Sequence, residues 1–106
     1  MVNNVERSFR ALGHPVRRRI VQRLARSPAT VGDATVGLDV SKPAVTRHLK
    51  VLEGAGLVAR DVTGRTHTLR LVDQPLAEAA GWIDRQRALW EGKFDAIEEF
   101  LQEDDR

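Results

Sequence analysis

The stretch from Val40 to Val58 constrains the fold of this chain most, because it combines a helix start, two opposed faces and a helix stop. Ser41 is a favoured N-cap residue, and Gly54 and Gly56 bracket the end of the segment. At about 100° per residue, its apolar residues gather on one side and a polar set gathers opposite. The apolar side holds Val45, Leu49 and Leu52, and the polar side holds Pro43, Thr46, Arg47 and Lys50. Such a helix can be anchored to a small core while it presents cations to the major groove of DNA.

The charge of the chain is divided between two parts, although the formal net charge is only +2. Residues 1–70 contain 13 Lys or Arg against 5 Asp or Glu, for a net charge of +8. Residues 71–106 contain 4 against 10, for a net charge of −6. A basic segment joined to an acidic one is typical of a nucleic-acid-binding surface attached to a solvated assembly element. The alternative is that both are ordinary solvated surfaces.

The length and the residue types exclude several classes of protein. A chain of 106 residues is predicted to form one domain, over residues 1–106, that buries roughly 65% of its unfolded surface. Cysteine is absent, which excludes disulfides, thiolate metal sites and thiol redox sensing. The sequence has no apolar run of about 18 residues and no secretory signal, so we expect a cytoplasmic protein that does not enter a membrane. It also lacks a cysteine nucleophile, a Gly-x-Ser-x-Gly motif and a phosphate-binding glycine-rich loop, so we expect neither an enzyme nor a cofactor.

Three shorter helices are predicted before the helix that starts at Ser41. The first has apolar residues four and three positions apart and ends near Gly13. A second helix begins at His14-Pro15, is rich in arginine and ends before Pro28. A short third helix is predicted over residues 30–37, with Thr30 as its N-cap, and residues 38–40 form the turn that follows. The sequence therefore predicts a helix-turn-helix over about residues 30–55.

The apolar period changes to two after this segment, which predicts a β-hairpin over about residues 57–72. Val58 and Val62 share one side of the first strand, and His67, Leu69 and Leu71 share one side of the second. Between the strands, Thr63-Gly64-Arg65-Thr66 is predicted to form the turn. The hairpin is thus expected to be a wing with an arginine at its tip.

The last helix, predicted over about residues 74–102, carries more apolar surface than one side of a small monomer needs. Two neighbouring stripes widen its apolar arc to about half of the circumference. We expect a second copy of the chain to cover this surface together with the first helix. The alternative is that the last helix folds back fully onto its own domain. The residues expected at the dimer interface are Val5, Phe9, Trp82, Ile83, Leu89, Trp90, Phe94, Ile97 and Leu101.

The order of these elements and two motifs resemble the ArsR/SmtB family of winged-helix transcriptional repressors. One motif is Ser-Lys-Pro-Ala-Val-Thr-Arg-His-Leu-Lys-Val-Leu-Glu-Gly-Ala-Gly-Leu-Val, which starts at Ser41, and the other is Ala-Leu-Gly-His-Pro-Val-Arg-Arg-Arg-Ile, which starts at Ala11. The resemblance covers the chain from about Phe9 to Leu101. It implies a mainly α fold with a β-hairpin wing, that is, a winged helix-turn-helix with a long C-terminal dimerisation helix. It also implies a homodimer that represses by binding a double-stranded DNA operator, and a ligand that relieves repression.

The metal-binding motifs of this family are missing from the sequence. Metal-sensing members carry Cys-x-Cys in the third helix, where this chain has Thr30-Val31-Gly32. Other members carry Asp-x-His in the last helix and a further histidine downstream, whereas this chain has Asp84-Arg85-Gln86 and no histidine after His67. We expect no metal. The alternative is an oxygen-only site across a dimer, made by Asp84, Asp95, Glu98 and Glu99.

The expected DNA contacts lie on the outward face of the Ser41 helix and on the wing. Arg47 and Lys50 are one turn apart, and arginine is the commonest reader of guanine. At the helix start, Lys42 is better placed to contact phosphate. Arg65 is expected to reach the neighbouring minor groove or backbone from the wing tip, with Arg60 in support. The full set of expected contacts is Ser41, Lys42, Pro43, Thr46, Arg47, Lys50, Arg60, Thr63 and Arg65.

Other cations and the histidines are weaker candidates for these contacts. Part of the run Arg17–Arg19 lies on the solvent side of the second helix, so one of these arginines could also touch phosphate. His48 lies angularly beside Val45 and Leu52, and we expect it to be a half-buried packing and hydrogen-bonding residue. Structural roles are expected for His14 and His67 too.

Together these features predict a homodimeric repressor that places two Ser41 helices in successive major grooves of an inverted repeat. An unknown small-molecule effector is a possible further partner, and the aromatic-rich junction of the terminal helices is the place to look for its site. Two other interpretations stay open. The chain could be a winged-helix interaction module whose long helix binds a different protein, or it could coat DNA without sequence preference.

Overall fold

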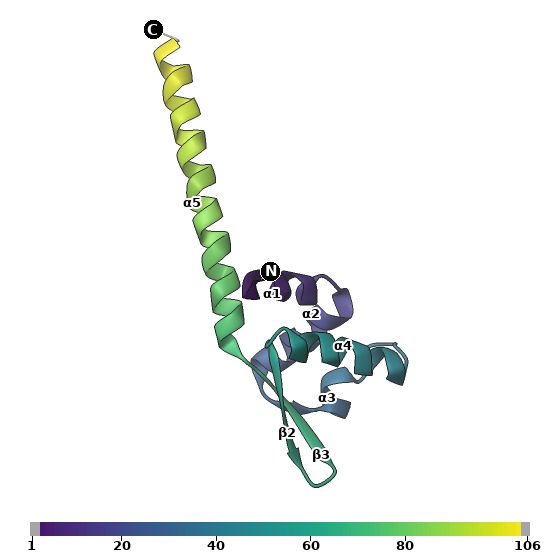
Figure 1. Cartoon of the computed structure of the whole chain (residues 1–106). Helices are drawn as coiled ribbons and strands as arrows, with labels where there is room; N and C mark the ends of the chain where they lie inside the picture. The colour runs from purple at the N-terminus through teal and green to yellow at the C-terminus, as the bar shows by residue number, and fades with distance from the viewer. Residues whose placement is uncertain (1–2, 105–106) are drawn as a thin grey trace.

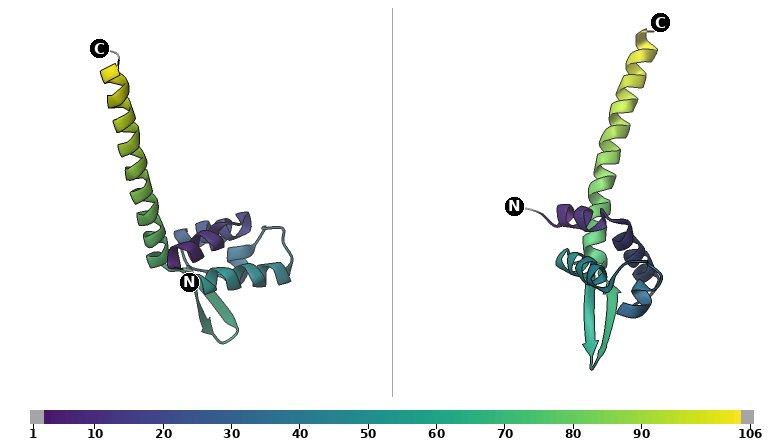
Figure 2. Two further views of the ribbon diagram at one scale, coloured as in Figure 1. Left: turned by 45° about the horizontal axis from the view of Figure 1, so that its top comes forward. Right: turned by 90° about the vertical axis from the view of Figure 1, so that its right-hand side faces the viewer.

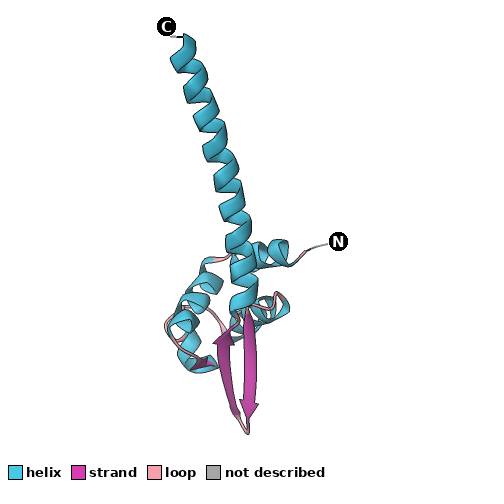
Figure 3. Cartoon of the chain, turned by 90° about the vertical axis from the view of Figure 1, so that its left-hand side faces the viewer, coloured by secondary structure: helices cyan, strands magenta, loops and turns pink. Residues whose placement is uncertain are grey.

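The computed structural model describes residues 3–104 and contains five helices and three strands within that range. Figure 1 shows their order along the chain, and Figure 3 colours them by type. The fold is mainly α with a β-hairpin wing, as predicted. The elements are α1 (Asn4–Leu12), α2 (Pro15–Arg26), β1 (Ala29–Thr30), α3 (Val31–Thr35), α4 (Lys42–Gly54), β2 (Val58–Thr63), β3 (Thr66–Leu71) and α5 (Asp73–Asp104).

Side-chain caps explain where the first four helices begin. The Asn3 carboxamide oxygen accepts a hydrogen bond from the Glu6 N–H at 2.8 Å, and Thr30 and Ser41 cap α3 and α4 in the same way. In α2, Pro15 occupies the first turn and the His14 ring accepts from the Val16 N–H. The predicted N-caps Thr30 and Ser41 are therefore confirmed.

The sheet is small and antiparallel, with the strand order β1-β3-β2. β2 and β3 pair from Val58 opposite Leu71 to Thr63 opposite Thr66, so the turn contains only Gly64 and Arg65. Gly64 has a φ of +61°, which favours glycine at the first position of a tight hairpin turn. The sequence did not predict β1, which pairs Ala29 with Leu69. The helix predicted over residues 30–37 is shorter in the structure, because it ends at Thr35.

The core lies where α2, α4 and the sheet meet. Ile20 and Leu24 face inward from α2, Leu49 and Leu52 from α4, and each is at most 3% exposed. Leu38, in the turn before α4, is also buried. The remaining buried members of this cluster are Ala11, Ala34, Leu57, Val58 and Leu69. This core fixes α4 by one side and leaves its opposite side uncovered.

α5 leaves the winged-helix body and projects into solvent, on the side opposite the wing (Figure 1; Figure 2). Its first half packs against α1, where Ala79 is buried and Gln86 is half-buried. From Arg87 to Glu103 every side chain is exposed. The radius of gyration is 19.5 Å, well above the value of about 13 Å for a compact chain of this length. The alternative in which the last helix folds back fully onto its own domain is therefore wrong for this structure.

Candidate nucleic-acid interface

The outward face of α4 is the clearest candidate for contact with nucleic acid. Leu49 and Leu52 bury the inner side of the helix, and Val45 is half-buried beside them. All of the residues predicted to contact DNA from this helix and its N-cap are exposed. They are Ser41, Lys42, Pro43, Thr46, Arg47 and Lys50. The predicted separation of an anchoring side and a free side is confirmed.

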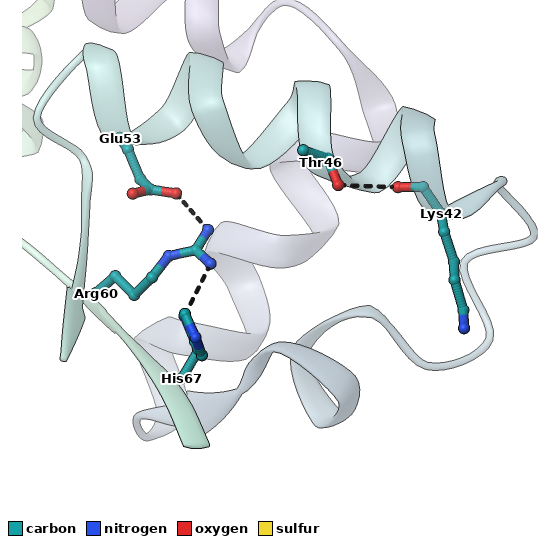
Figure 4. Close-up of polar contacts among 5 residues, drawn as sticks. All are labelled: Lys42, Thr46, Glu53, Arg60 and His67. Carbon is teal, nitrogen blue, oxygen red and sulfur yellow. Dashed lines mark hydrogen bonds and ion pairs between the residues drawn. The ribbon is translucent and has the colours of Figure 1, made fainter. Parts of the chain in front are cut away.

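Local hydrogen bonds shape the first turn of α4. The Ser41 hydroxyl accepts from the Ala44 N–H at 3.2 Å. The Thr46 hydroxyl donates to the Lys42 carbonyl at 3.2 Å, while the Lys42 amine extends away from the helix (Figure 4). With its hydroxyl turned back to the backbone, Thr46 offers its methyl group as the part that remains for contact with a thymine methyl. Lys42 is a mobile point charge, which suits a phosphate.

The wing carries its own cation at the tip. Arg65 lies in the turn between β2 and β3, Thr63 is the last residue of β2, and both are exposed. β2 contacts α4 near the base of the hairpin, and the tip of the hairpin points away from α5 (Figure 1). The turn that carries Arg65 is thus at the end of the molecule opposite α5.

Arg60 has a different position, at the base of the wing. Its guanidinium donates to the Glu53 carboxylate at 2.6 Å, and its other terminal nitrogen lies 3.2 Å from Nδ1 of His67 (Figure 4). Arginine only donates, so His67 is the acceptor. The bridge joins the end of α4 to both strands of the wing. The structure thus places Arg60 as a support for the wing, and its guanidinium is engaged within the chain.

His48 lies on α4 between the exposed polar side of the helix and the core, and it is half-buried as predicted. Its Nδ1 is 3.2 Å from Nη1 of Arg17, and its ring centroid is 4.3 Å from that of His14. Burial, followed by the charges of His14, Arg17 and Arg47, holds the pKa of His48 below its ordinary value of 6.5. All three histidines therefore have structural contacts, in agreement with the prediction.

Several arginines of α2 are used inside the body. Arg17 donates to the Ala11 and Arg10 carbonyls, and Arg18 donates to the Leu12 carbonyl. Arg23 donates to the carbonyls of Ala34 and Val36 at the end of α3. These carbonyls lie at helix ends, where backbone acceptors lack helical partners. Each of the three nitrogens of Arg17 makes one contact within the chain, but a guanidinium has five N–H groups, so phosphate contact by one of Arg17–Arg19 stays a prediction.

The residues expected at a dimer interface divide into two groups. Val5 is half-buried, and Phe9 and Trp82 contact each other edge to face, with ring centroids 5.6 Å apart. Their contact joins α1 to α5 within one chain, which the sequence did not predict, although both rings remain more than one third exposed. Ile83 is exposed on the same part of α5. The second group, on the projecting half of α5, is at least 55% exposed and comprises Leu89, Trp90, Phe94, Ile97 and Leu101.

Two further observations concern other kinds of site. Within residues 3–104, no group of three or more histidine, aspartate or glutamate side chains is arranged to hold a metal ion. No helix in that same range has the length and apolar character that crossing a membrane requires. The acidic side chains of α5 from Asp73 to Glu103, including Asp95 and Glu98, are exposed.

Sequence reasoning missed two contacts that orient the candidate interface. Glu53 was not singled out, yet it holds Arg60, and Arg17 was considered only as a phosphate contact. For the contact between Arg17 and His48, the available signal was the angular position of His48 beside Val45 and Leu52. Nothing in the local pattern pointed to the contact between Glu53 and Arg60, since an acidic residue near a helix end is usually solvated.

Comparisons with known proteins agree with this geometry. Residues 12–61 match a helix-turn-helix domain family. The chain is 41% identical over 80 residues to the HTH-type transcriptional regulator Rv2034 of Mycobacterium tuberculosis, an alignment that covers 76% of this chain and 75% of that protein. It is 43% identical to the transcriptional repressor SmtB of the same organism over 65% of this chain, but only 51% of that repressor is covered.

Solved structures show the same fold. The crystal structure of an ArsR family transcriptional regulator superposes with a TM-score of 0.79 at 31% identity, over 84% of this chain and 98% of that one. An ArsR-like regulator from Rhodococcus sp. RHA1 superposes with a TM-score of 0.76 at 28% identity, over 92% of each chain.

Proposed function

This chain belongs to the ArsR/SmtB family of winged-helix transcriptional regulators, and on that premise we propose that it is a homodimeric repressor that binds an inverted-repeat operator. The observation that carries the proposal is the pair of opposed faces on α4. Leu49 and Leu52 anchor the helix, and the opposite side presents exposed Arg47 and Lys50. A helix held in this way can enter a major groove with its cations toward the bases.

Each residue of the interface has a proposed role. Arg47 reads guanine, with Lys50 and Thr46 beside it on the same face. Lys42 and the backbone at Ser41 contact phosphate, and Pro43, which has no backbone N–H, contacts DNA through its ring. From the wing, Arg65 and Thr63 contact the neighbouring backbone or minor groove, and Arg60 keeps the wing in place through Glu53.

The projecting half of α5 supports the homodimer. It leaves a row of large apolar side chains uncovered, and a second copy of the same helix would remove them from water. Such a row on a monomer would be a liability, because exposed apolar patches promote association. A two-fold axis between the two copies would also match the symmetry of an inverted repeat, whose half-sites lie roughly 34 Å apart.

The absence of cysteine supports a regulator that does not sense metals through thiolates. An effector that relieves repression is what membership of the family suggests. We propose to look for its site where Phe9 meets Trp82, because this contact joins α1 to the start of α5.

The experiment that tests the proposal is selection from a random duplex library with the purified, metal-free protein at about 150 mM salt. The expected result is an inverted repeat whose half-sites lie about one helical turn apart. Recovery of no motif, with binding that disappears as salt rises, would contradict the proposal and indicate a protein that coats DNA without sequence preference.

The same exposed half of α5 also favours a second candidate function, in which this helix binds a different protein. Light scattering of the purified protein separates the two. A stable dimer supports the repressor, and a stable monomer supports an interaction module.

A further inference from the structure

We propose that Arg17 and His48 are positioning residues for DNA reading: they hold α4 against the end of α1, and they do so only while the His48 ring is neutral. The inference rests on the proposed function, because it concerns how the reading helix is presented to DNA. Neither residue needs to touch DNA for this role.

Arg17 connects three helices through one side chain. It belongs to α2, and its Nε donates to the Ala11 carbonyl at 2.6 Å while its Nη2 donates to the Arg10 carbonyl at 3.2 Å. Both carbonyls belong to the last turn of α1. Its remaining nitrogen, Nη1, lies 3.2 Å from Nδ1 of His48 on α4. A planar guanidinium can satisfy these three acceptors together, whereas an ammonium is a single point of charge.

The contact between Arg17 and His48 defines the state of the histidine ring. Arginine has donors and no acceptor, so Nδ1 of His48 must accept and carries no proton. The ring is therefore neutral, with its proton on Nε2. The neighbouring His14 ring is in a similar situation, since its Nδ1 accepts from the Val16 N–H at 3.1 Å.

A proton on His48 would break this arrangement. The groups that act on its charge are His14 and Arg17 at the start of α2 and Arg47 on α4 itself. Each of these is a cation or becomes one, so protonation removes an acceptor and adds repulsion in the same place. Arg47 is also the proposed base reader, and it directly precedes His48 in the chain. A change in how His48 is held is thus transmitted to the reading face.

The direction of the pH effect follows from this arrangement. Burial and the surrounding cations place the pKa of His48 in the folded protein below 6.5, its ordinary value. Above that pKa the ring is neutral and α4 is held. As the pH falls through it, the free protein gains a proton at His48, and the fraction that can bind DNA with α4 in place decreases. The apparent affinity falls by the same fraction.

Two substitutions by side chains of nearly equal size separate the loss of the hydrogen-bond acceptor at position 48 from the loss of its protonation. His48→Asn keeps an acceptor oxygen in a position comparable to Nδ1 and cannot be protonated in this range, whereas His48→Leu removes the acceptor. The probes are the duplex selected by the parent protein and a scrambled duplex of equal length. We expect His48→Leu to lose about tenfold for the selected duplex and much less for the scrambled one, about 1.4 kcal/mol of discrimination. His48→Asn should bind both duplexes like the parent protein.

Measurement of the affinity for the selected duplex from about pH 8 to about pH 5 tests whether protonation of His48 weakens binding. Relative to His48→Asn, the affinity of the parent protein for the selected duplex should fall by up to about tenfold per pH unit below the pKa of His48. The comparison is made with His14→Asn in both proteins, because the His14 ring faces His48 and would otherwise titrate differently in each; asparagine keeps a side-chain acceptor for the Val16 N–H. A relative rise in affinity would mean that His48 binds DNA as a cation, and it would overturn the inference.

A measurement without DNA makes the result independent of the operator. NMR titration should show the pKa of His48 below its ordinary value in the parent protein and raised in Arg17→Met, which removes the charge and the donors. An ordinary pKa that does not respond to Arg17→Met would overturn the inference. If the parent protein selects no motif, the proposed function fails. If it selects one and His48→Leu discriminates equally well, only the positioning role fails.

Discussion

α4 and the projecting half of α5 are both helices with one uncovered side, but they expose opposite kinds of chemistry. α4 exposes cations and buries Leu49 and Leu52 within its own chain. The projecting half of α5 exposes aromatic and aliphatic side chains, among them Trp90 and Phe94, whose rings stack with centroids 5.6 Å apart. The first surface is stable in water as it stands, because charged groups are well solvated. The second gains free energy only when something covers it.

This difference separates two steps of function within one small chain. The reading surface is completed by folding, since the core positions α4 and two side-chain bridges fix what surrounds it. In the proposed homodimer, the α5 surface is completed by association. A monomer should therefore present a finished reading helix but only one of them, and a specific complex with an inverted repeat should need both steps.

The largest expected effect comes from making the exposed side of α5 polar. In the double variant Trp90→Glu with Phe94→Glu, we expect a monomer whose affinity for the selected inverted repeat falls at least about 100-fold, because the second half-site is no longer bound intramolecularly. Sedimentation equilibrium and fluorescence anisotropy measure the two changes. Circular dichroism should show that the body remains folded.

Val62→Glu is the matched control for the change in assembly. Val62 is 57% exposed, close to the 59% of Phe94, but it lies on the wing. This variant should remain a dimer. A double variant of α5 that also remains a dimer would contradict the assignment of this helix to the interface.

The next largest effect is on stability, and it distinguishes a leucine that is buried within the chain from one that is proposed to be buried between two chains. Leu52 is fully buried and Leu101 is 56% exposed. Leu52→Ala should lower the free energy of unfolding by about 2–5 kcal/mol at every protein concentration, because it leaves a cavity in the core. Leu101→Ala should cost less than about 0.5 kcal/mol where the protein is monomeric and more where it is dimeric. Urea unfolding at several protein concentrations measures the free energy of unfolding of both variants. A loss of stability that is equal for the two variants and independent of protein concentration would contradict the distinction between the core and the α5 surface.

The two regions also differ in how well the sequence predicted them. The boundaries of α4 followed from Ser41, Pro43 and Gly54, which act locally, and its two sides followed from helical periodicity. The strand β1 was missed, because two residues carry no period and are held only by pairing with Leu69 far along the chain. Periodicity identified the apolar stripes of α5 but could not tell which residues α1 would cover. That depends on how α1 and α5 pack together.

Contacts of single side chains were the least predictable part of the site. Arg17 binds backbone carbonyls of α1 and a histidine 31 positions away. The angular position of His48 indicated a half-buried residue, but local spacing did not identify Arg17 as its partner. Arg60 was expected to contact DNA in support of Arg65, and its ion pair with Glu53 was not predicted. In each case the chain brings together residues whose sequence separation exceeds a helical turn. The exposed side of α4 was, by contrast, placed correctly by periodicity alone.

A smaller effect is expected at the base-reading position. Arg47→Ala should cost about 1–3 kcal/mol at one base pair of the operator and should relax the preference there, since a bidentate contact with guanine is lost. Binding to duplexes with single base substitutions measures this preference. Equal weakening for every sequence would show that Arg47 contacts the backbone instead.

The smallest effect compares the same charge removed from the two regions. Lys42→Ala should weaken binding to all sequences about equally and reduce the salt slope of the binding constant by about 1, because one phosphate contact releases about one counterion. Lys93→Ala should leave this slope unchanged. Lys93 lies 6.0 Å from the Trp90 ring centroid on the projecting half of α5, and this half of the helix extends away from the winged-helix body (Figure 1). Binding titrations of one duplex over a range of salt concentrations give both slopes. A salt slope for Lys42→Ala that equals the slope of the parent protein would mean that Lys42 makes no phosphate contact. A reduced slope for Lys93→Ala alone would place DNA against α5 and reverse the roles of the two surfaces.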